Sequence, residues 1–188
     1  MRVIAGQYRS RPLKTLPGLD IRPSSDRLRE TLFNILTAGD PSAIVGKTFF
    51  DLYAGTGAVG IEALSRGAAA VYFLESSKKA SDLILRNLQS LGINSGFEIL
   101  RGEVQSGLRL LDRRAVVGDI FFLDPPYRMT SEYRTAMEIL AASNLMQNES
   151  IVVAEHEKKF DPGEQAGGMV RFRTVKQGDT ALSFYRKA

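Results

Sequence analysis

The chain has 188 residues, of which 44% are hydrophobic and 24% charged, a balance typical of a globular protein with one sizeable core. It contains no cysteine and one histidine, which argues against iron–sulfur clusters, the usual zinc sites and a thiolate nucleophile. No apolar run approaches the roughly 18 residues of a membrane span, and the first residues lack the apolar core of a signal peptide, so a cytoplasmic protein without a metal is expected.

Basic side chains are concentrated at the N-terminus. The net charge is +4, and residues 1–39, with seven basic and three acidic side chains, account for all of it. Prolines within residues 1–23 predict an irregular arm. A basic arm suits the phosphate backbone of a nucleic acid, although a solvated chain end can have the same composition. The candidate nucleic-acid contacts are the aromatic and basic side chains Tyr8, Arg9, Arg11, Arg22 and Arg27.

A helix is predicted to begin near Ser24-Ser25-Asp26, which suit an N-cap, and to end at Gly39. Its apolar face is formed by Leu28, Leu32, Ile35 and Leu36. From Gly46 onward strands alternate with helices, which indicates a largely parallel sheet that binds ligands at the carboxyl ends of its strands. The expected strands are 47–52, 69–75, 97–101, 119–124 and 150–155, and the expected helices are 57–66, 78–91, 104–112 and 131–142.

A glycine-rich turn follows the first strand of this region. Gly55, Gly57 and Gly60 form the pattern G-x-G-x-x-G, which lets the backbone approach a nucleotide-like cofactor closely. The next strand ends in Glu75, a position at which an acidic side chain commonly binds ribose hydroxyls. Glu62, on the helix after the turn, is expected to be an exposed helix former. These features suit NAD and S-adenosylmethionine equally.

Asp51, at the end of the strand before the turn, favours S-adenosylmethionine. Its carboxylate would repel the pyrophosphate of a dinucleotide, whereas the sulfonium and ammonium groups of S-adenosylmethionine would attract it. An aspartate that merely caps the turn is the structural alternative. The candidate cofactor-binding residues of this region are Asp51, Tyr53, Gly55, Thr56, Gly57 and Glu75.

The strand 119–124 ends in Asp124-Pro125-Pro126-Tyr127. The two prolines stop the pairing of the strand because neither has an N–H group to donate. An acidic side chain, unpaired carbonyl oxygens and an aromatic ring then lie at its carboxyl end. This set can hold the exocyclic amine of a flat base and stack on its face, although an ordinary Pro-Pro turn is the simpler interpretation.

The C-terminal part changes its pattern. Residues 156–168 are expected to form an exposed loop, with His156 at the surface. Residues 170–176 and 181–186 predict a strand, a turn and a strand, which would add an antiparallel hairpin to the sheet. The predicted fold is therefore a Rossmann-like α/β fold in a single domain 1–188, in which the arm and helix 1–39 precede a core at 46–188.

In this order the motifs resemble the RsmD-like family, bacterial methyltransferases that modify the exocyclic N2 of a guanine in small-subunit (16S) ribosomal RNA. The resemblance covers nearly the whole chain. The stretch RPSSDRLRETLFN at 22–34 is its specific part, whereas the glycine turn and the Asp124–Tyr127 motif occur more widely. Further matching segments are IAGQYRSR at 4–11, Asp51 to Gly60, and GDTALSFYR at 178–186.

The resemblance implies an enzyme that transfers a methyl group from S-adenosylmethionine to a guanine N2 amine. Tyr127 would stack on the base, while Asp124 and the carbonyl of Pro125 would accept hydrogen bonds from the amine, with Pro126 completing the motif. Glu103, after the third strand, would either reach the adenine of the cofactor or begin the next helix. The resemblance also implies an assembled or assembling small ribosomal subunit as the partner, and a monomer is expected.

Three other functions remain open on the sequence alone. An adenine or cytosine amine in DNA would use the same Asp124–Tyr127 motif, but no separate target-recognition domain is visible. An NAD-linked oxidoreductase would explain the glycine turn and Glu75, but not Asp51. A non-catalytic RNA-binding module with this fold would leave both intact motifs without a role.

Overall fold

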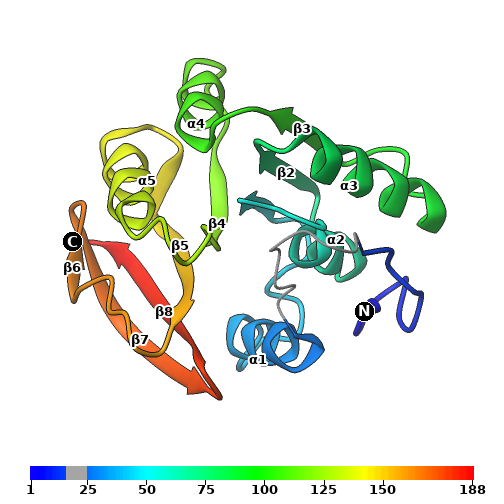
Figure 1. Ribbon diagram of the computed structural model, residues 1–188, viewed down its shortest axis with the longest axis horizontal. Helices are drawn as coiled ribbons and strands as arrows, with labels where there is room; N and C mark the ends of the chain where they lie inside the picture. The colour runs from blue at the N-terminus through cyan, green and yellow to red at the C-terminus, as the bar shows by residue number, and fades with distance from the viewer. Residues whose placement is uncertain (16–24) are drawn as a thin grey trace.

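The computed structural model describes residues 1–15 and 25–188. These residues form a sheet of eight strands in the order β3-β2-β1-β4-β5-β8-β7-β6 (Figure 1). Strands β1 to β5 are parallel, and β6, β7 and β8 are antiparallel to their neighbours. The strands are β1 (Thr48–Leu52), β2 (Ala70–Glu75), β3 (Phe97–Arg101), β4 (Gly118–Leu123), β5 (Met146–Glu157), β6 (Gln165–Ala166), β7 (Met169–Gln177) and β8 (Thr180–Lys187).

Helices cover both faces of the sheet. The helices are α1 (Asp26–Leu36), α2 (Ala58–Ser65), α3 (Lys78–Leu91), α4 (Val104–Arg113) and α5 (Ser131–Ala142). Residues of α1, α2 and α3 share one buried apolar cluster with the sheet, and residues of α4 and α5 share a second. The predicted mostly parallel sheet with an antiparallel C-terminal hairpin is thus confirmed. Within the described ranges, no helix is long and apolar enough to cross a membrane.

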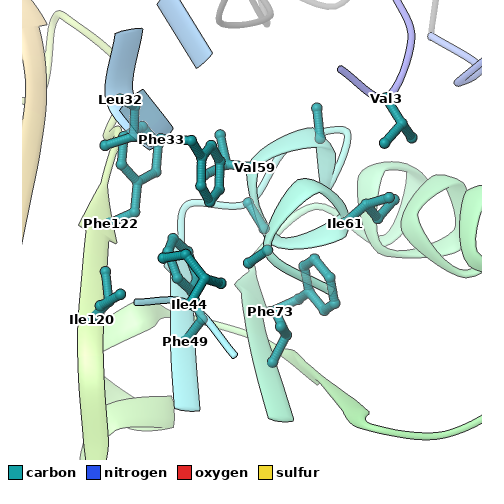
Figure 2. Packing of buried hydrophobic residues seen from close by; sticks show 14 of the residues in the cluster. Val3, Leu32, Phe33, Ile44, Phe49, Val59, Ile61, Phe73, Ile120 and Phe122 are labelled. Atoms are coloured by element: carbon teal, nitrogen blue, oxygen red, sulfur yellow. The ribbon is translucent and has the colours of Figure 1, made fainter. Parts of the chain in front are cut away.

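The first cluster joins α1 and the N-terminal arm to the sheet. Figure 2 shows Leu32 and Phe33 of α1 near Phe49 and Phe122 of the strands, with Val3 of the arm at the far side of α2. The rings of Phe33 and Phe49 are stacked, with their centroids 6.2 Å apart. Because these side chains are removed from water, each contributes about 1.5–3 kcal/mol to the stability of the fold.

Local signals place most helix ends where the sequence predicts them. The Ser25 hydroxyl accepts a hydrogen bond from the Leu28 N–H at 3.1 Å and begins α1, which ends at Leu36, before the predicted Gly39. Gly92, in the left-handed region at a φ of 75°, ends α3. The bounds of α2 to α5 and β1 to β4 agree with the prediction to within one residue, whereas β5 begins earlier, at Met146.

The expectation that Glu62 is exposed is wrong. Its side chain is fully buried, because the N-terminal arm lies over α2. The Glu62 carboxylate accepts hydrogen bonds from the N–H groups of Ile4 at 2.7 Å and Ala5 at 3.0 Å. Arg66 also donates to it at 2.8 Å, and Arg29 lies 3.9 Å away. A helical pattern shows where a residue lies on its helix, but not that a remote segment covers that position.

The expectation of an exposed loop at 156–168, with His156 at the surface, is also wrong in part. β5 continues to Glu157, and its pairing with β8 buries His156 at 3% exposure. One His156 ring nitrogen lies 2.9 Å from the Ser183 hydroxyl, and burial is the largest cause that lowers the pKa of this imidazole. Ala166 of β6 is buried as well. β5 continues to Glu157 because β8 pairs with it there. The polar residues at the end of β5 gave no sign of this pairing in the sequence.

Candidate active site

Four acidic residues lie where neighbouring parallel strands end. Leu52 pairs with Leu74 and with Leu123, so the ends of β1, β2 and β4 are level, and Leu123 pairs with Ala154, three residues before the end of β5. The acids at or beside these ends are Asp51, Glu75, Asp124 and Glu155. The first three were predicted to share one site, and the strand register brings them to one edge. Glu155, buried at 3% exposure, was not singled out although it ends the predicted strand 150–155, because no motif surrounds it.

The glycine turn between β1 and α2 needs backbone conformations that favour glycine. Gly55 has a φ of 55°, and Gly57, at the N-cap of α2, has a φ of 75°. Gly60 allows α2 to pack closely on β2, because a Cβ atom added there would lie 2.3 Å from a ring carbon of Phe73. The turn and the first residues of α2 are all buried.

Two carboxylates accept hydrogen bonds from backbone N–H groups of this turn and of α2. The Asp51 carboxylate accepts from the Gly60 N–H at 2.9 Å, and the Glu75 carboxylate accepts from the Gly55 N–H at 2.8 Å. Glu75 also accepts from Ser77 N–H at 2.7 Å. In a dinucleotide-binding turn such N–H groups and the helix N-terminus hold the pyrophosphate. Since two carboxylates already occupy them here, the turn is unsuited to a phosphate group.

Burial makes the carboxylates costly to ionise. The pKa of Asp51 is raised from 3.8 to about 8, mainly by burial, with the charges of Glu75 and Glu155 adding to it and the Gly60 N–H opposing it. Burial also raises the pKa of Asp124 well above its usual value, with further contributions from Glu155 and Asp51. A positively charged ligand would relieve this repulsion, so the electrostatics of the site favour a cation.

The residues after Asp124 end β4 beside the acids of the neighbouring strands. The Asp124 N–H still bonds to the Leu52 carbonyl at 3.4 Å, and the prolines then end the strand. Pro125 is buried, Pro126 is exposed and Tyr127 is half-buried. Nearby, the Tyr133 hydroxyl of α5 donates to the Glu155 carbonyl at 2.7 Å. The motif therefore lies next to the acids of β1 and β5, as its position in the sequence predicted.

Tyr53 holds the loop after β1 in a strained conformation. Its φ of 63° lies in the left-handed region, which is uncommon for a bulky residue. The Tyr53 hydroxyl donates to Glu132 of α5 at 2.7 Å, and Gln105 of α4 also donates to Glu132. Sequence reasoning missed Glu132 and Gln105, because nothing in their helical patterns indicates a contact between two helices and a loop.

Two other predicted positions differ in their surroundings. Thr56 is buried, and its carbonyl accepts from the Asn87 side chain at 3.1 Å. The same Asn87 side chain bonds the backbone of Lys14 through both its oxygen and its nitrogen, and so joins the glycine turn to the arm. Glu103 is the exposed N-cap residue of α4. It therefore begins a helix, and its contact with an adenine stays a prediction.

The N-terminal arm lies over α2 and α3, far in sequence from both. The Gln7 N–H donates to the Ser65 carbonyl at 2.7 Å, and the Tyr8 N–H to the Ser65 hydroxyl at 3.0 Å. Of the candidate nucleic-acid contacts, Tyr8 is half-buried and Arg9, Arg11 and Arg27 are exposed, while Arg22 lies outside the described residues.

Not every basic residue of this region faces solvent. Arg29 is buried at 1% exposure and forms an ion pair with Asp26, with 2.6 Å between nitrogen and oxygen. It also donates to the Arg2 carbonyl at 2.9 Å. Part of the basic excess of residues 1–39 therefore stabilises the fold and is not available to a ligand. Over the described residues, no group of three or more histidine, aspartate or glutamate side chains could hold a metal ion.

Comparison with known proteins decides the family. A family model described as "Conserved hypothetical protein 95" matches residues 1–186. The chain belongs to this family. It is 30% identical over 187 residues to "Putative rRNA methyltransferase YlbH" of Bacillus subtilis, a match that covers 100% of this chain and 99% of that protein. It is also 32% identical over 157 residues to "Ribosomal RNA small subunit methyltransferase D" of Escherichia coli, covering 84% and 75%. The resemblance to RsmD-like methyltransferases is thereby confirmed.

Solved structures support the same fold for this member of the family. "Putative methyltransferase yhhF from Escherichia coli" has a TM-score of 0.83 at 29% identity, with 100% of this chain and 97% of that chain covered. A structure titled "Crystal structure of SMU.776, a putative methyltransferase complexed with SAH" has a TM-score of 0.67 at 14% identity and covers 85% of this chain and 48% of that one. The Rossmann-like methyltransferase fold is therefore confirmed.

Proposed function

We propose that the protein transfers a methyl group from S-adenosylmethionine to the exocyclic N2 amine of a guanine in small-subunit ribosomal RNA. The observation that carries the proposal is the occupation of the glycine turn by Asp51 and Glu75, next to Asp124. This arrangement disfavours the phosphates of NAD and favours a cationic cofactor. The names of the relatives in Bacillus subtilis and Escherichia coli support ribosomal RNA as the acceptor.

The residues at the turn fit the cofactor. Asp51 would lie near the methionine end and Glu75 near the ribose, where its carboxylate is already fixed by two backbone N–H groups. Glu103 would approach the adenine. When bound, S-adenosylmethionine supplies an electrophilic methyl group on its sulfonium. The backbone of the turn would enclose the cofactor through Tyr53, Gly55, Thr56 and Gly57.

The motif after β4 would position the acceptor. A guanine leaves its stack, which costs a few kcal/mol, and Tyr127 stacks on the extruded base. Asp124 and the Pro125 carbonyl accept hydrogen bonds from the N2 amine, while Pro126 fixes the turn. The lone pair of this amine is delocalised into the ring, so orientation matters, and positioning of this kind can lower the barrier by about 7–11 kcal/mol.

The proton balance of the step involves Asp124. The bound cofactor would supply the methyl group and leave as the neutral thioether, and the new N–C bond would make the amine nitrogen positive and acidic. Asp124 in its ionised form would then accept that proton more readily than an exposed carboxylate would, because burial raises its pKa. We also propose that one domain, 1–188, performs the reaction as a cytoplasmic monomer, on an assembled or assembling small subunit that presents the base.

The test is transfer of a labelled methyl group to small ribosomal subunits from a strain that lacks this protein, followed by nucleoside analysis. Label in N2-methylguanosine supports the proposal. Label in another nucleoside would mean that the acceptor is not the guanine N2 amine. Absence of label from both subunits and naked RNA would contradict an RNA substrate.

Asp124→Asn provides the residue-level test. We expect turnover to fall by at least about a hundred-fold, because proton acceptance is lost, while the dissociation constant of S-adenosylmethionine changes little. Asp82→Asn, which changes a surface aspartate paired with Arg101, is the matched control and should keep full turnover. Full turnover of Asp124→Asn would remove Asp124 from the mechanism.

A further inference from the structure

One face of the C-terminal hairpin formed by β7 and β8 is open to solvent. Val170 and Phe172 of β7 are 41% and 48% exposed, which is unusual for large apolar residues of a sheet. Val170 pairs with Arg186 of β8, so both side chains lie on the same face. Figure 1 shows the hairpin at the opposite end of the sheet from the N-terminal arm.

A β-bulge places an additional aromatic residue on this face. Arg171 pairs with Tyr185 and Arg173 with Phe184, so Phe172 has no residue of its own opposite it. The Phe172 ring lies 6.1 Å from that of Phe184, between centroids. The guanidinium carbon of Arg186 lies 4.7 Å from the centroid of Phe172. We define the hairpin face as the open surface formed by Val170, Phe172, Arg173 and Arg186.

The charge of this hairpin is as strong as that of the N-terminal arm. Residues 169–188 carry five basic side chains and one acidic one, while residues 40–168 carry thirteen basic and seventeen acidic ones. The negative charge of residues 40–168 therefore cancels the positive charge of the hairpin when the net charge of the whole chain is calculated. Arg171 is engaged with Asp161, and Lys187 with the Met146 carbonyl, but Arg173 and Arg186 are exposed and form no ion pair with a described residue.

We propose that the hairpin face binds an unpaired stretch of the ribosomal RNA substrate. This inference rests on the proposed function and adds a second contact surface to it. Single-stranded RNA is recognised where open sheet faces display aromatic rings and guanidinium planes on which bases stack. The stacked pair of Phe172 and Arg186 offers such a platform, and Arg173 beside it can contact a phosphate.

The position of the hairpin face suits an RNA that also reaches the active site. Phe184 and Leu182 of β8 belong to the same apolar cluster as α1 and Val3 of the arm, so the face and the arm lie on one side of the sheet. Phe122, Val153, Phe184 and Arg173 are paired in one row across β4, β5, β8 and β7, so Arg173 of the hairpin face lies level with Phe122, two residues before Asp124. Three strand spacings separate β4 from β7, about 14 Å, which a few nucleotides can bridge.

Protection of a sheet edge explains only part of this arrangement. Beyond Arg171 the outer edge of β7 has no partner strand among the described residues. Basic side chains on such an edge prevent pairing with other proteins, which accounts for Lys176. Edge protection disfavours a large exposed ring, however, because an apolar side chain promotes association. Phe172 therefore needs a different explanation, and base stacking provides one.

The test compares three variants, Phe172→Ala, Arg173→Ala and Arg186→Ala, on small ribosomal subunits from a strain lacking the protein. We expect Phe172→Ala to raise the KM for subunits at least about five-fold with kcat little changed, because the chemistry is remote. Arg173→Ala should reduce the dependence of log Kd on log salt by about one. Leu110→Ala and Arg109→Ala, exposed on α4 on the other side of the sheet, are matched controls.

Ultraviolet cross-linking separates this inference from the proposed function. A nucleotide cross-linked to the peptide that contains Phe172 supports RNA at the hairpin face, even if no methyl group is transferred. Methylation by the wild type, with KM unchanged in all three variants and no cross-link at Phe172, would overturn the inference and leave the proposed function standing. If Phe172→Ala unfolds, Arg173→Ala and the cross-link still test whether RNA binds the hairpin face. Arg173 is exposed, so its replacement should leave the fold intact.

Discussion

Asp51 combines its proposed role in cofactor binding with a cost in stability. In the folded protein its pKa is about 8, mainly because the carboxyl group is buried, whereas its ordinary value is 3.8. The folded protein therefore holds a proton that the unfolded chain releases near pH 4. Between these values the unfolded state binds fewer protons, so the contribution of Asp51 makes the protein less stable as the pH rises. The residue is best explained by a ligand that gains from its charge.

Asp51→Asn should therefore stabilise the unliganded protein and weaken the binding of S-adenosylmethionine. We expect the gain in Tm over wild type to grow from pH 4 to about pH 8 and to level off above it. Loss of a charged contact worth about 1.5–3 kcal/mol should weaken binding roughly ten- to hundred-fold. Thermal unfolding across pH and calorimetric titration measure the two effects.

A gain in Tm independent of pH would show that Asp51 does not titrate in this range. Unchanged affinity for the cofactor would remove Asp51 from its binding site. The side-chain amide oxygen introduced by Asp51→Asn can still accept from the Gly60 N–H, so loss of that hydrogen bond does not complicate the comparison.

At the scale of elements, Glu62 connects the N-terminal arm to α2 and α1. Its buried carboxylate bonds backbone groups of the arm and the side chain of Arg66. Arg29 of α1 lies beside it, fully buried. Removing one member of a buried charged group leaves the others without compensation, which is usually costly.

Glu62→Gln should destabilise the protein by about 3 kcal/mol, because an amide cannot accept all of these hydrogen bonds and Arg29 loses a buried countercharge. Denaturant unfolding measures the change in the free energy of unfolding. Glu98→Gln is the control, since Glu98 pairs with Arg114 at the surface and should cost about 1 kcal/mol or less. Equal effects of the two variants would mean that the arm does not depend on Glu62.

The elements of the core were predictable because their signals are local. Short stretches of sequence contain the helix caps, such as Ser25 and Gly92. They also show the alternation of apolar strands with amphipathic helices. What could not be predicted depends on distant segments. The arm buries Glu62, and β8 extends β5 and buries His156. Neither partner is near the affected residue in the sequence.

In the candidate site, too, residues with local signals were predictable, whereas residues that depend on distant segments or lack a motif were not. Asp51, Glu75 and Asp124 were predictable because each ends a strand, and parallel strands bring their carboxyl ends together. Glu155 was missed because no motif surrounds it, although it ends the predicted strand 150–155, and Glu132 because its partner Tyr53 lies on another element. The roles assigned to these residues stay predictions until the variants are measured.

At the scale of the whole molecule, charge alternates along the chain. A basic arm and helix precede an acidic middle, and a basic hairpin follows it. The strand order places the hairpin at one end of the sheet, while the arm packs on α2 and α3 toward the other. Under the proposed function, RNA would be attracted to two regions that flank the acidic site, which suits the entry of an uncharged base between them.

Replacing Arg9 and Arg11 by alanine should weaken RNA binding and reduce its salt dependence by up to about two, because two phosphate contacts are lost. Arg11 also donates to the Ser90 carbonyl at 3.0 Å, so Arg9→Ala alone is the cleaner variant. Binding to small subunits at several salt concentrations measures the slope. Arg109→Ala serves again as the control, and an unchanged slope in the double variant would show that the arm is only a solvated chain end.

The bonds from Ile4, Ala5, Gln7 and Tyr8 to α2 have a consequence for the energetics of recognition. A segment that becomes ordered only on contact with its partner loses about 1–2 kcal/mol of conformational freedom per residue, and this is subtracted from its affinity. Here the folding of the protein itself has already ordered residues 4–8 of the arm. Arg9 and Arg11 are thus presented on an ordered backbone, and under the proposed function the energy of each phosphate contact would be retained as affinity.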